Sequence, residues 1–169
     1  MSSDAPSRAE LLQHPLLTTI GLIIEAHAGI AQAVEQRLEE ECGLSAQWFE
    51  VLIRLARTPG QRLRMSDLAA QTTLSASGLT RAVDRLEAAG LVCREACPTD
   101  RRSTYAVLTA DGEQRVMAGL PVHVRHAEEM ISSVFSPAEV ATFTDLVRRL
   151  RDGVNPAAAQ ASAPGGLGH

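Results

Sequence analysis

Hydroxyl and guanidinium side chains recur at helical spacing between residues 75 and 85. These side chains are Ser75, Ser77, Thr80, Arg81 and Arg85. Leu79, Val83 and Leu86 fall at i, i+4 and i+7, so one face of this segment is apolar and the polar set shares the other. Such hydroxyls and guanidinium groups bond phosphates and guanine edges in the DNA major groove. We therefore predict a recognition helix over about 75–89, capped by Ser75 or a neighbour and ended by Gly90.

A second polar group, Asp100, Arg101 and Arg102, lies at the tip of a predicted hairpin over about 91–108. The chain enters this hairpin through 91–93, turns near Pro98 and returns through 105–108. Upstream, Ser66 is expected to cap a short helix that ends at Gln71, and a turn at 72–74 follows. The order of these elements is that of a helix-turn-helix followed by a β wing.

The segment MSDLAAQTTLSASGLTRAVDRLEAAGLVCREACPTDRRSTYAVLTADGEQ resembles the winged helix of the MarR family of bacterial transcription regulators. The resemblance lies in the helix pair, in the segment "DRLEAAGLV" at the end of the recognition helix, in the wing residues "DRR", and in the "LT" with Gly112 at the start of the next helix. The resemblance implies that the recognition helix enters the major groove of double-stranded DNA. It also implies that Arg101 or Arg102, held by Asp100, reaches a minor groove, where narrow A·T-rich DNA attracts arginine.

The charge distribution favours the same surface. The formal net charge is −4, which argues against a nucleic-acid binder when it is taken alone. However, residues 54–102 hold nine arginines against five acids, whereas the remainder holds seven arginines against fifteen acids. The basic charge is therefore concentrated where DNA would lie, and binding should weaken with salt. The alternative is an ordinary solvated helix face.

The remaining sequence predicts a mainly α fold with a small β wing, a winged helix-turn-helix with N- and C-terminal dimerisation helices. We expect a flexible arm at 1–10, a dimerisation helix at 11–44, the DNA-binding domain at 45–108, dimerisation helices at 109–153 and a disordered tail at 154–169. Pro121 should kink the helix near Gly119. Candidate homodimer contacts are Leu11, Leu12, Leu16, Leu17, Val134, Phe135, Val140 and Phe143. Alternatively, about half of these pack within one chain.

Three kinds of control are open. A small aromatic or anionic effector could bind between the dimer helices and the winged helix, a site that the family often uses, through His27, Trp48, Arg54 and His123. However, a tryptophan on an amphipathic helix, such as Trp48, is more often a core residue. His123 and His126, three residues apart near Glu129, are weak metal candidates that His27 or Cys42 might complete, and no metal is expected.

Redox control through Cys42, Cys93 or Cys97 is the third possibility. Cys93 and Cys97 on one extended strand would have Cα atoms about 13 Å apart, beyond disulfide reach. Buried inert thiols are the simpler interpretation.

Other function classes have less support. No glycine-rich phosphate loop or recognisable nucleophile turn is present, so we expect neither an enzyme nor a cofactor. The N-terminus lacks the pattern of a signal peptide and no uninterrupted apolar run approaches 18 residues, which predicts a cytoplasmic protein without membrane contact. A winged helix that binds protein rather than DNA would be expected to lose its arginines. The sequence favours a homodimeric regulator on a pseudo-palindromic operator, by family default a repressor released by a small molecule.

Overall fold

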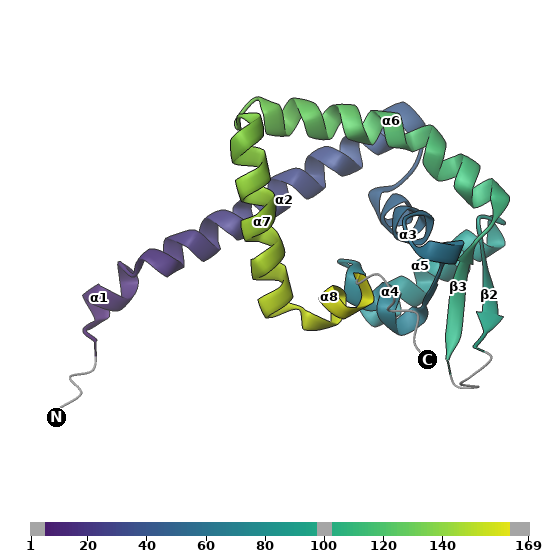
Figure 1. The fold of residues 1–169 in the computed structure, drawn as a ribbon, viewed down its shortest axis with the longest axis horizontal. Coiled ribbons are helices and arrows are strands. Elements are labelled where there is room, and N and C mark those ends of the chain that lie inside the picture. The colour runs from purple at the N-terminus through teal and green to yellow at the C-terminus, as the bar shows by residue number, and fades with distance from the viewer. Residues whose placement is uncertain (1–5, 98–102, 163–169) are drawn as a thin grey trace.

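The computed structural model describes residues 6–97 and 103–162, and helices dominate it (Figure 1). In chain order the elements are α1 (Arg8–Leu12), α2 (Pro15–Cys42), α3 (Ala46–Ala56), η1 (Pro59–Gln61), β1 (Arg62–Arg64), α4 (Met65–Gln71), α5 (Ala76–Ala88), β2 (Val92–Ala96), β3 (Thr104–Leu108), α6 (Ala110–Ser132), α7 (Pro137–Val154) and α8 (Pro156–Ser162). This confirms the predicted fold class, a mainly helical chain with a small β wing.

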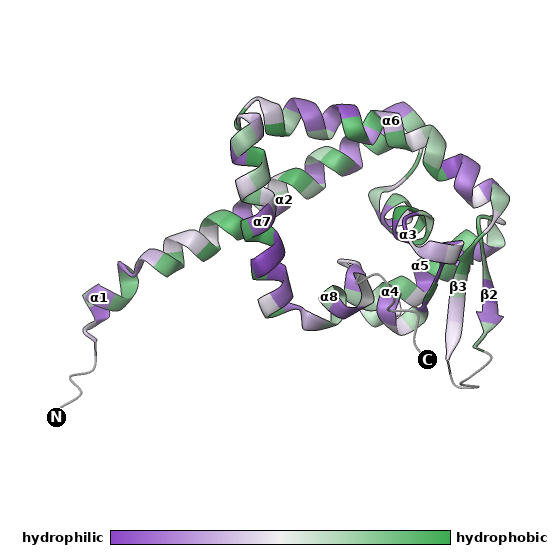
Figure 2. Cartoon of the chain, in the orientation of Figure 1, coloured by the Kyte–Doolittle hydropathy of each residue, from purple (hydrophilic) through white to green (hydrophobic). Residues whose placement is uncertain are grey.

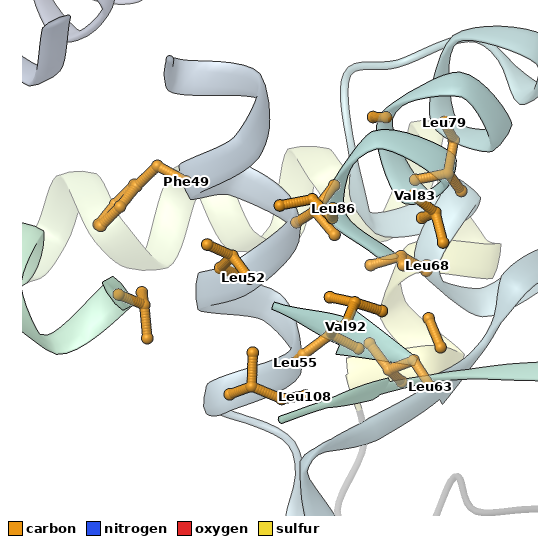
Figure 3. Close-up of a cluster of buried hydrophobic side chains, with 14 of the residues drawn as sticks. Phe49, Leu52, Leu55, Leu63, Leu68, Leu79, Val83, Leu86, Val92 and Leu108 are labelled. Carbon is orange, nitrogen blue, oxygen red and sulfur yellow. The ribbon is translucent and has the colours of Figure 1, made fainter. Parts of the chain in front are cut away.

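The core belongs to the winged helix-turn-helix. An antiparallel sheet of order β1-β3-β2 pairs Leu63 with Ala106 and Cys93 with Val107. Against it pack apolar side chains of α3, α4 and α5, many of them fully buried, and Figure 3 shows Leu52, Leu55, Leu68, Val83 and Leu86 of these helices beside Val92 of β2. Burial of this apolar area is the main stabilising term, and it fixes α5 against the sheet.

The junction of α5, the wing and α6 is tightly packed at Gly112. Thr109 caps α6 by accepting a hydrogen bond from Gly112 N, and its hydroxyl donates to the Gly90 carbonyl at 2.7 Å. The backbone N–H of Thr109 donates to the Leu91 carbonyl. Gly112 lies so close to Leu91 that a Cβ there would be 2.0 Å from the Leu91 carbonyl oxygen. The start of α6 is therefore joined to the end of α5 by backbone contact.

Helix α6 returns along α2 and holds its C-terminal end. Arg115 donates to the carbonyls of Cys42 and Gly43 at 2.7 and 2.8 Å, and Arg125 pairs with Glu41. The helix continues without interruption through Pro121, while its ribbon changes direction along its length in Figure 1. Proline removes one backbone hydrogen bond, and packing against α2 and α3 keeps the remaining turns helical.

Both ends of the chain differ from the sequence prediction. Residues 8–10 of the expected flexible arm belong to α1, because Ser7 and Glu10 form a capping box. In the expected disordered tail, Pro156 begins α8, whose alanines have high helix propensity. This helix packs on α4, and Asn155 Nδ2 donates to the Ala70 carbonyl at 3.1 Å. The absence of periodicity was thus a misleading signal for these residues.

The start of α4 also differs from the sequence prediction, because Ser66 does not cap this helix. It begins at Met65, with Arg64 at the N-cap, so Ser66 lies within the first turn rather than capping it. The Ser66 hydroxyl instead donates to Asp67 Oδ1 at 3.3 Å. The β1 strand runs directly into this helix and leaves no residue between the two elements for a serine cap.

Apolar side chains cover much of α1, α2 and α7 without burial in the single chain (Figure 2). Leu11, Leu12, Leu16 and Leu17 are all more than half exposed, as is Val134. Phe135 stacks on Phe143 with ring centroids 5.1 Å apart, although Phe143 is still 44% exposed. Val140 is half-buried. This exposed apolar area exceeds that of scattered surface residues on an ordinary monomer.

The segment Arg8–Cys42 is also long and apolar enough to cross a membrane, by length and composition alone. Charged and polar residues interrupt its apolar run, so no uninterrupted apolar stretch marks this segment in the sequence. A single such helix is weak evidence for a membrane span, since an interface helix of a soluble protein has the same composition.

Candidate nucleic-acid interface

Helix α5 is held with one face in the core and the other in solvent. Ser75 caps it by accepting a hydrogen bond from Gly78 N at 3.1 Å, as the sequence predicted. At the other end, Gly90 adopts a φ of +74°, a left-handed conformation that suits glycine. Leu79, Val83 and Leu86 are buried, and they fix the rotation of the helix about its axis. The opposite face is presented as one exposed strip.

The predicted hydroxyl and arginine side chains of this segment differ in their local bonds: the hydroxyls have partners within the segment, whereas the two arginines have no ion pair with a described residue. Ser75 is engaged in the cap, and the Thr80 hydroxyl donates to the Ala76 carbonyl at 3.0 Å. The Ser77 hydroxyl lies 3.4 Å from that of Ser75. Arg81 and Arg85 are exposed, and neither forms an ion pair with any residue that the structure describes. The two guanidinium groups are therefore the side chains best placed to meet an external anion.

The acids of α5 are neutralised from within the domain. Arg94 of β2 donates to Asp84 at 2.7 Å and to Glu87 at 2.5 Å, and its backbone N–H donates to Glu87 at 3.1 Å. Burial lowers the pKa of Arg94, but its hydrogen bonds to Asp84 and Glu87 outweigh burial and raise the pKa overall. This arginine was not a predicted site residue, because its partners become neighbours only when β2 packs on α5.

An Arg94→Ala variant should lose both ion pairs and leave two acids uncompensated beside the arginines of α5. Each partly exposed ion pair contributes much less to the free energy of unfolding than a buried one. We therefore expect this free energy to fall by about 1 kcal/mol. Urea unfolding measures this loss, and hydrogen exchange should be faster in β2. Arg148→Ala, which removes an exposed pair with Asp145 on α7, is the matched control. Equal stability of the two variants would contradict this role for Arg94.

Strand β1, which pairs with β3 of the wing, holds two further arginines that were not among the predicted site residues. Arg62 and Arg64 of β1 lie over the Tyr105 ring, with guanidinium carbons 5.2 and 5.9 Å from its centroid. Arg64 Nε also donates to the Tyr105 hydroxyl at 3.4 Å. The predicted wing contacts Asp100, Arg101 and Arg102 lie outside the described residues. Thus the described part of the site combines exposed arginines on α5 with arginines on the sheet.

The comparisons with known proteins agree with this geometry. A model of the MarR family matches residues 43–103. The HTH-type transcriptional regulator MhqR of Bacillus subtilis is 35% identical over 108 residues, which are 64% of this chain and 72% of MhqR. The MarR family regulator Sco3205 from Streptomyces coelicolor was solved in complex with DNA. Its structure superposes on this one with a TM-score of 0.71 at 28% sequence identity, and the match covers 90% of this chain and 91% of the Sco3205 chain. The chain belongs to the MarR family of transcriptional regulators.

A further solved structure shows the same fold at lower identity. BpsR of Bordetella bronchiseptica is 23% identical with a TM-score of 0.69, covering 80% of this chain and 99% of BpsR. Its structure concerns regulation of DNA binding by 6-hydroxynicotinic acid.

The four residues predicted to bind an effector in this MarR protein belong to three helices, α2, α3 and α6. His123 of α6 lies against Phe49 of α3, with ring centroids 4.8 Å apart, and burial together with nearby His126 lowers the pKa of His123. Trp48 packs partly on the core, and His27 is exposed on α2. Arg54 stands five residues after Phe49, about 140° around the helix, on a different face of α3.

The imidazole pair on α6 is not part of a recognisable metal centre. No group of three or more His, Cys, Asp or Glu side chains suited to a metal ion occurs within residues 6–97 and 103–162. Both ring nitrogens of His126 are nevertheless buried without a hydrogen-bond partner among the residues that the structure describes. His123 and His126 therefore form a half-buried, largely apolar and incompletely bonded region beside Phe49.

The three cysteines occupy different surroundings in this MarR protein. Cys42 and Cys93 are half-buried, and Cys97 is buried directly after the end of β2. The Cys97 thiol donates to the Tyr105 hydroxyl at 3.8 Å, and Arg64 Nη2 donates to the sulfur at 3.9 Å. These are long, weak contacts. They hold Cys97 as a packing residue between the wing and β1.

Proposed function

We propose that this MarR protein is a cytoplasmic homodimeric repressor that binds a pseudo-palindromic operator. The observation that carries this proposal is the exposed face of α5, where Arg81 and Arg85 form no ion pair with any described residue while the acids of the same helix are neutralised by Arg94. A helix with this charge pattern can enter a major groove without repulsion from its own carboxylates. The arginines at the wing base add positive charge beside it.

The exposed apolar faces of α1, α2 and α7 support the proposed dimer. A single winged helix covers too little DNA for strong specificity, whereas two copies related by a two-fold axis read two half-sites about one helical turn apart. The exposed leucines and isoleucines of α2, together with Phe143 and Leu146 of α7, provide apolar area for a second copy. Burying it in a dimer would be favourable by the same hydrophobic term that stabilises the core.

The effector proposal concerns the region beside Phe49. His123 and His126 offer ring nitrogens, and Phe49 offers an aromatic surface against His123, which suits a small aromatic compound. In BpsR, the same fold has DNA binding regulated by an aromatic acid. Binding here would lie between α3, which belongs to the DNA-binding domain, and α6, which continues toward the dimer helices. A ligand that prefers one relative position of these helices would change operator affinity.

The test is fluorescence anisotropy with DNA from upstream of the protein's own coding region and with scrambled DNA of equal length, across a salt series. We expect tighter, salt-sensitive binding to the upstream DNA with two chains per site. Arg81→Ala should reduce the preference for this DNA by about 1–3 kcal/mol if the side chain reads a base. Arg149→Ala on α7 removes the same charge from an exposed position away from α5 and should leave the preference unchanged.

Two results would count against the proposal. Equal affinity of the parent protein for both DNAs would indicate a protein-interaction module or a distant operator, and titration of fragmented genomic DNA separates these two. An Arg81→Ala variant that keeps the full preference for the upstream DNA would remove α5 as the base-reading element.

A further inference from the structure

A three-residue turn, 72–74, joins α4 to the recognition helix α5. Ser75, directly after this turn, is the N-cap of α5, so the path of the turn decides where the first residues of α5 lie. In helix-turn-helix proteins, these N-terminal residues contact the base edges. The buried side chains of α5 begin only at Leu79, one turn into the helix. The position of the N-terminal end of α5 therefore depends on what holds the turn.

The turn is held by a carboxylate of α3. Thr73 donates its backbone N–H to Glu50 Oε1 and its hydroxyl to Glu50 Oε2, both at 2.9 Å. Among the described residues, no other hydrogen bond joins residues 72–74 to another helix or strand, and Leu74 adds a partly buried apolar contact with the core. Hydrogen bonds to a charged carboxylate are stronger than neutral ones, and two of them fix an orientation as well as a distance. Glu50 thus holds both the backbone and the side chain of Thr73.

Glu50 is itself firmly placed, because its neighbours Val51 and Leu52 on α3 are fully buried in the core. One turn later, Arg54 stands at the i+4 spacing at which a glutamate and an arginine often pair on a helix. Arg54 forms no ion pair with a described residue, and the carboxylate of Glu50 bonds Thr73 instead. Helix α3 therefore presents to the turn a carboxylate that is not engaged in an ion pair along its own helix.

We propose that Glu50 is a positioning residue for base reading, which acts on the N-terminal end of α5 through Thr73 without contact to DNA. Specific contacts to base edges require side chains held within about 0.5 Å of their best geometry, and a freed turn lets the end of α5 move. An operator would then lose affinity, whereas unrelated DNA, which is held mainly through its phosphates, would lose little. This role rests on the proposed function, but the two hydrogen bonds to the turn do not depend on DNA.

The experiment compares Glu50→Ala with Glu50→Gln by fluorescence anisotropy on DNA from upstream of the coding region and on scrambled DNA. Both variants remove one negative charge, but the glutamine amide can still accept a hydrogen bond from Thr73 and donate one to its hydroxyl oxygen. Glu50→Ala should lower the preference for the upstream DNA by about tenfold, the size of one lost base contact. Its affinity for scrambled DNA should not fall, because loss of a negative charge favours DNA binding. Glu50→Gln should keep the preference to within about threefold.

Variants of Thr73 test the same bonds from the other side. Thr73→Val keeps the shape and the backbone N–H but loses the hydroxyl bond, so its preference should fall by about threefold, whereas Thr73→Ser should match the parent. Glu50→Ala combined with Thr73→Val should lose no more preference than Glu50→Ala alone, because the two substitutions remove one shared interaction.

Glu113→Ala is the matched control. It also removes a carboxylate that accepts a hydrogen bond at 2.9 Å from a distant segment, in this case from Gln61 Nε2. Because Glu113 lies in the first turn of α6 rather than beside the helix-turn-helix, its substitution should leave the preference for the upstream DNA unchanged.

Hydrogen exchange of the free protein measures the hold on the turn without DNA. The Thr73 amide should exchange faster in Glu50→Ala and as in the parent in Glu113→Ala. Unchanged exchange at Thr73 in Glu50→Ala, or full preference for the upstream DNA in that variant, would overturn the proposal. Equal losses of affinity for both DNAs would also overturn it, because a destabilised domain gives that result. A parent protein that prefers neither DNA contradicts the proposed function, and the exchange of Thr73 still decides whether Glu50 holds the turn.

Discussion

A Gly112→Ala variant is expected to lose a large part of its folding stability. A Cβ at this position would lie 2.0 Å from the Leu91 carbonyl oxygen and 2.8 Å from Leu108 Cδ1, both well inside van der Waals contact. The nearer neighbour is backbone, and its carbonyl already accepts the Thr109 N–H, so it cannot move without loss of that bond. Overpacking that shifts backbone in this way costs about 3 kcal/mol or more. That is a large fraction of the roughly 5–15 kcal/mol that stabilises a typical domain.

Urea unfolding followed by circular dichroism measures this effect directly. Gly153→Ala is the matched control, because nothing lies within 4 Å of a Cβ at Gly153 and the residue belongs to α7. Alanine in a helix is favoured over glycine by about 0.5–1 kcal/mol, so the control should be neutral or slightly stabilised. The same urea midpoint for Gly112→Ala and the parent would show that the junction between Leu91 and α6 can relax.

A protein with Leu16→Asp and Ile20→Asp together should no longer form the proposed dimer. Both side chains are more than half exposed in the single chain, so the substitutions disturb no core residue. In a dimer, each carboxylate would be buried against apolar side chains, and each substitution occurs twice. We expect dimer affinity to fall by at least about a thousandfold, which corresponds to about 4 kcal/mol. Operator affinity should fall with it, because a single winged helix contacts one half-site.

Sedimentation equilibrium measures the change in dimer affinity, and circular dichroism establishes that the winged helix remains folded. Thr18→Asp with Gln32→Asp adds the same charge on the opposite side of α2 and is the control. If the Leu16 and Ile20 double variant stays dimeric at micromolar concentration, the interface must lie elsewhere, with α7 as the next surface to substitute.

The DNA-binding domain was predictable because its signals are local. Ser75, the period of Leu79, Val83 and Leu86, and Gly90 together define α5 without knowledge of any other element. The sequence pattern shared with the MarR family predicted the wing and the start of α6 in the same way. Here helix propensity, capping and hydrophobic period agree, and such agreement makes a sequence specify its structure.

Features that depend on tertiary contacts were not predictable from those signals. Arg94 is unremarkable in the sequence, and its role arises only when β2 packs beside Asp84 and Glu87. The composition of residues 156–162 suggested no regular structure, but their contact with α4 favours a helix there. Arg54 was predicted to join His123, and the rotation of α3 places it on another face. Each of these requires the relative positions of elements that are distant in the sequence.

The bonds from Arg94 to α5 also constrain the DNA that such a protein can use. Two ion pairs and a backbone hydrogen bond join Arg94, in strand β2 of the wing, to the recognition helix α5. Because of these bonds, the wing and the helix move as one unit. Within a half-site, the base pairs read by the helix and those met by the wing must then keep a constant separation. The distance between the two half-sites is set instead by the long helices, which are joined to the domain differently. Natural operators should therefore tolerate base-pair insertions at their centre more readily than within either arm.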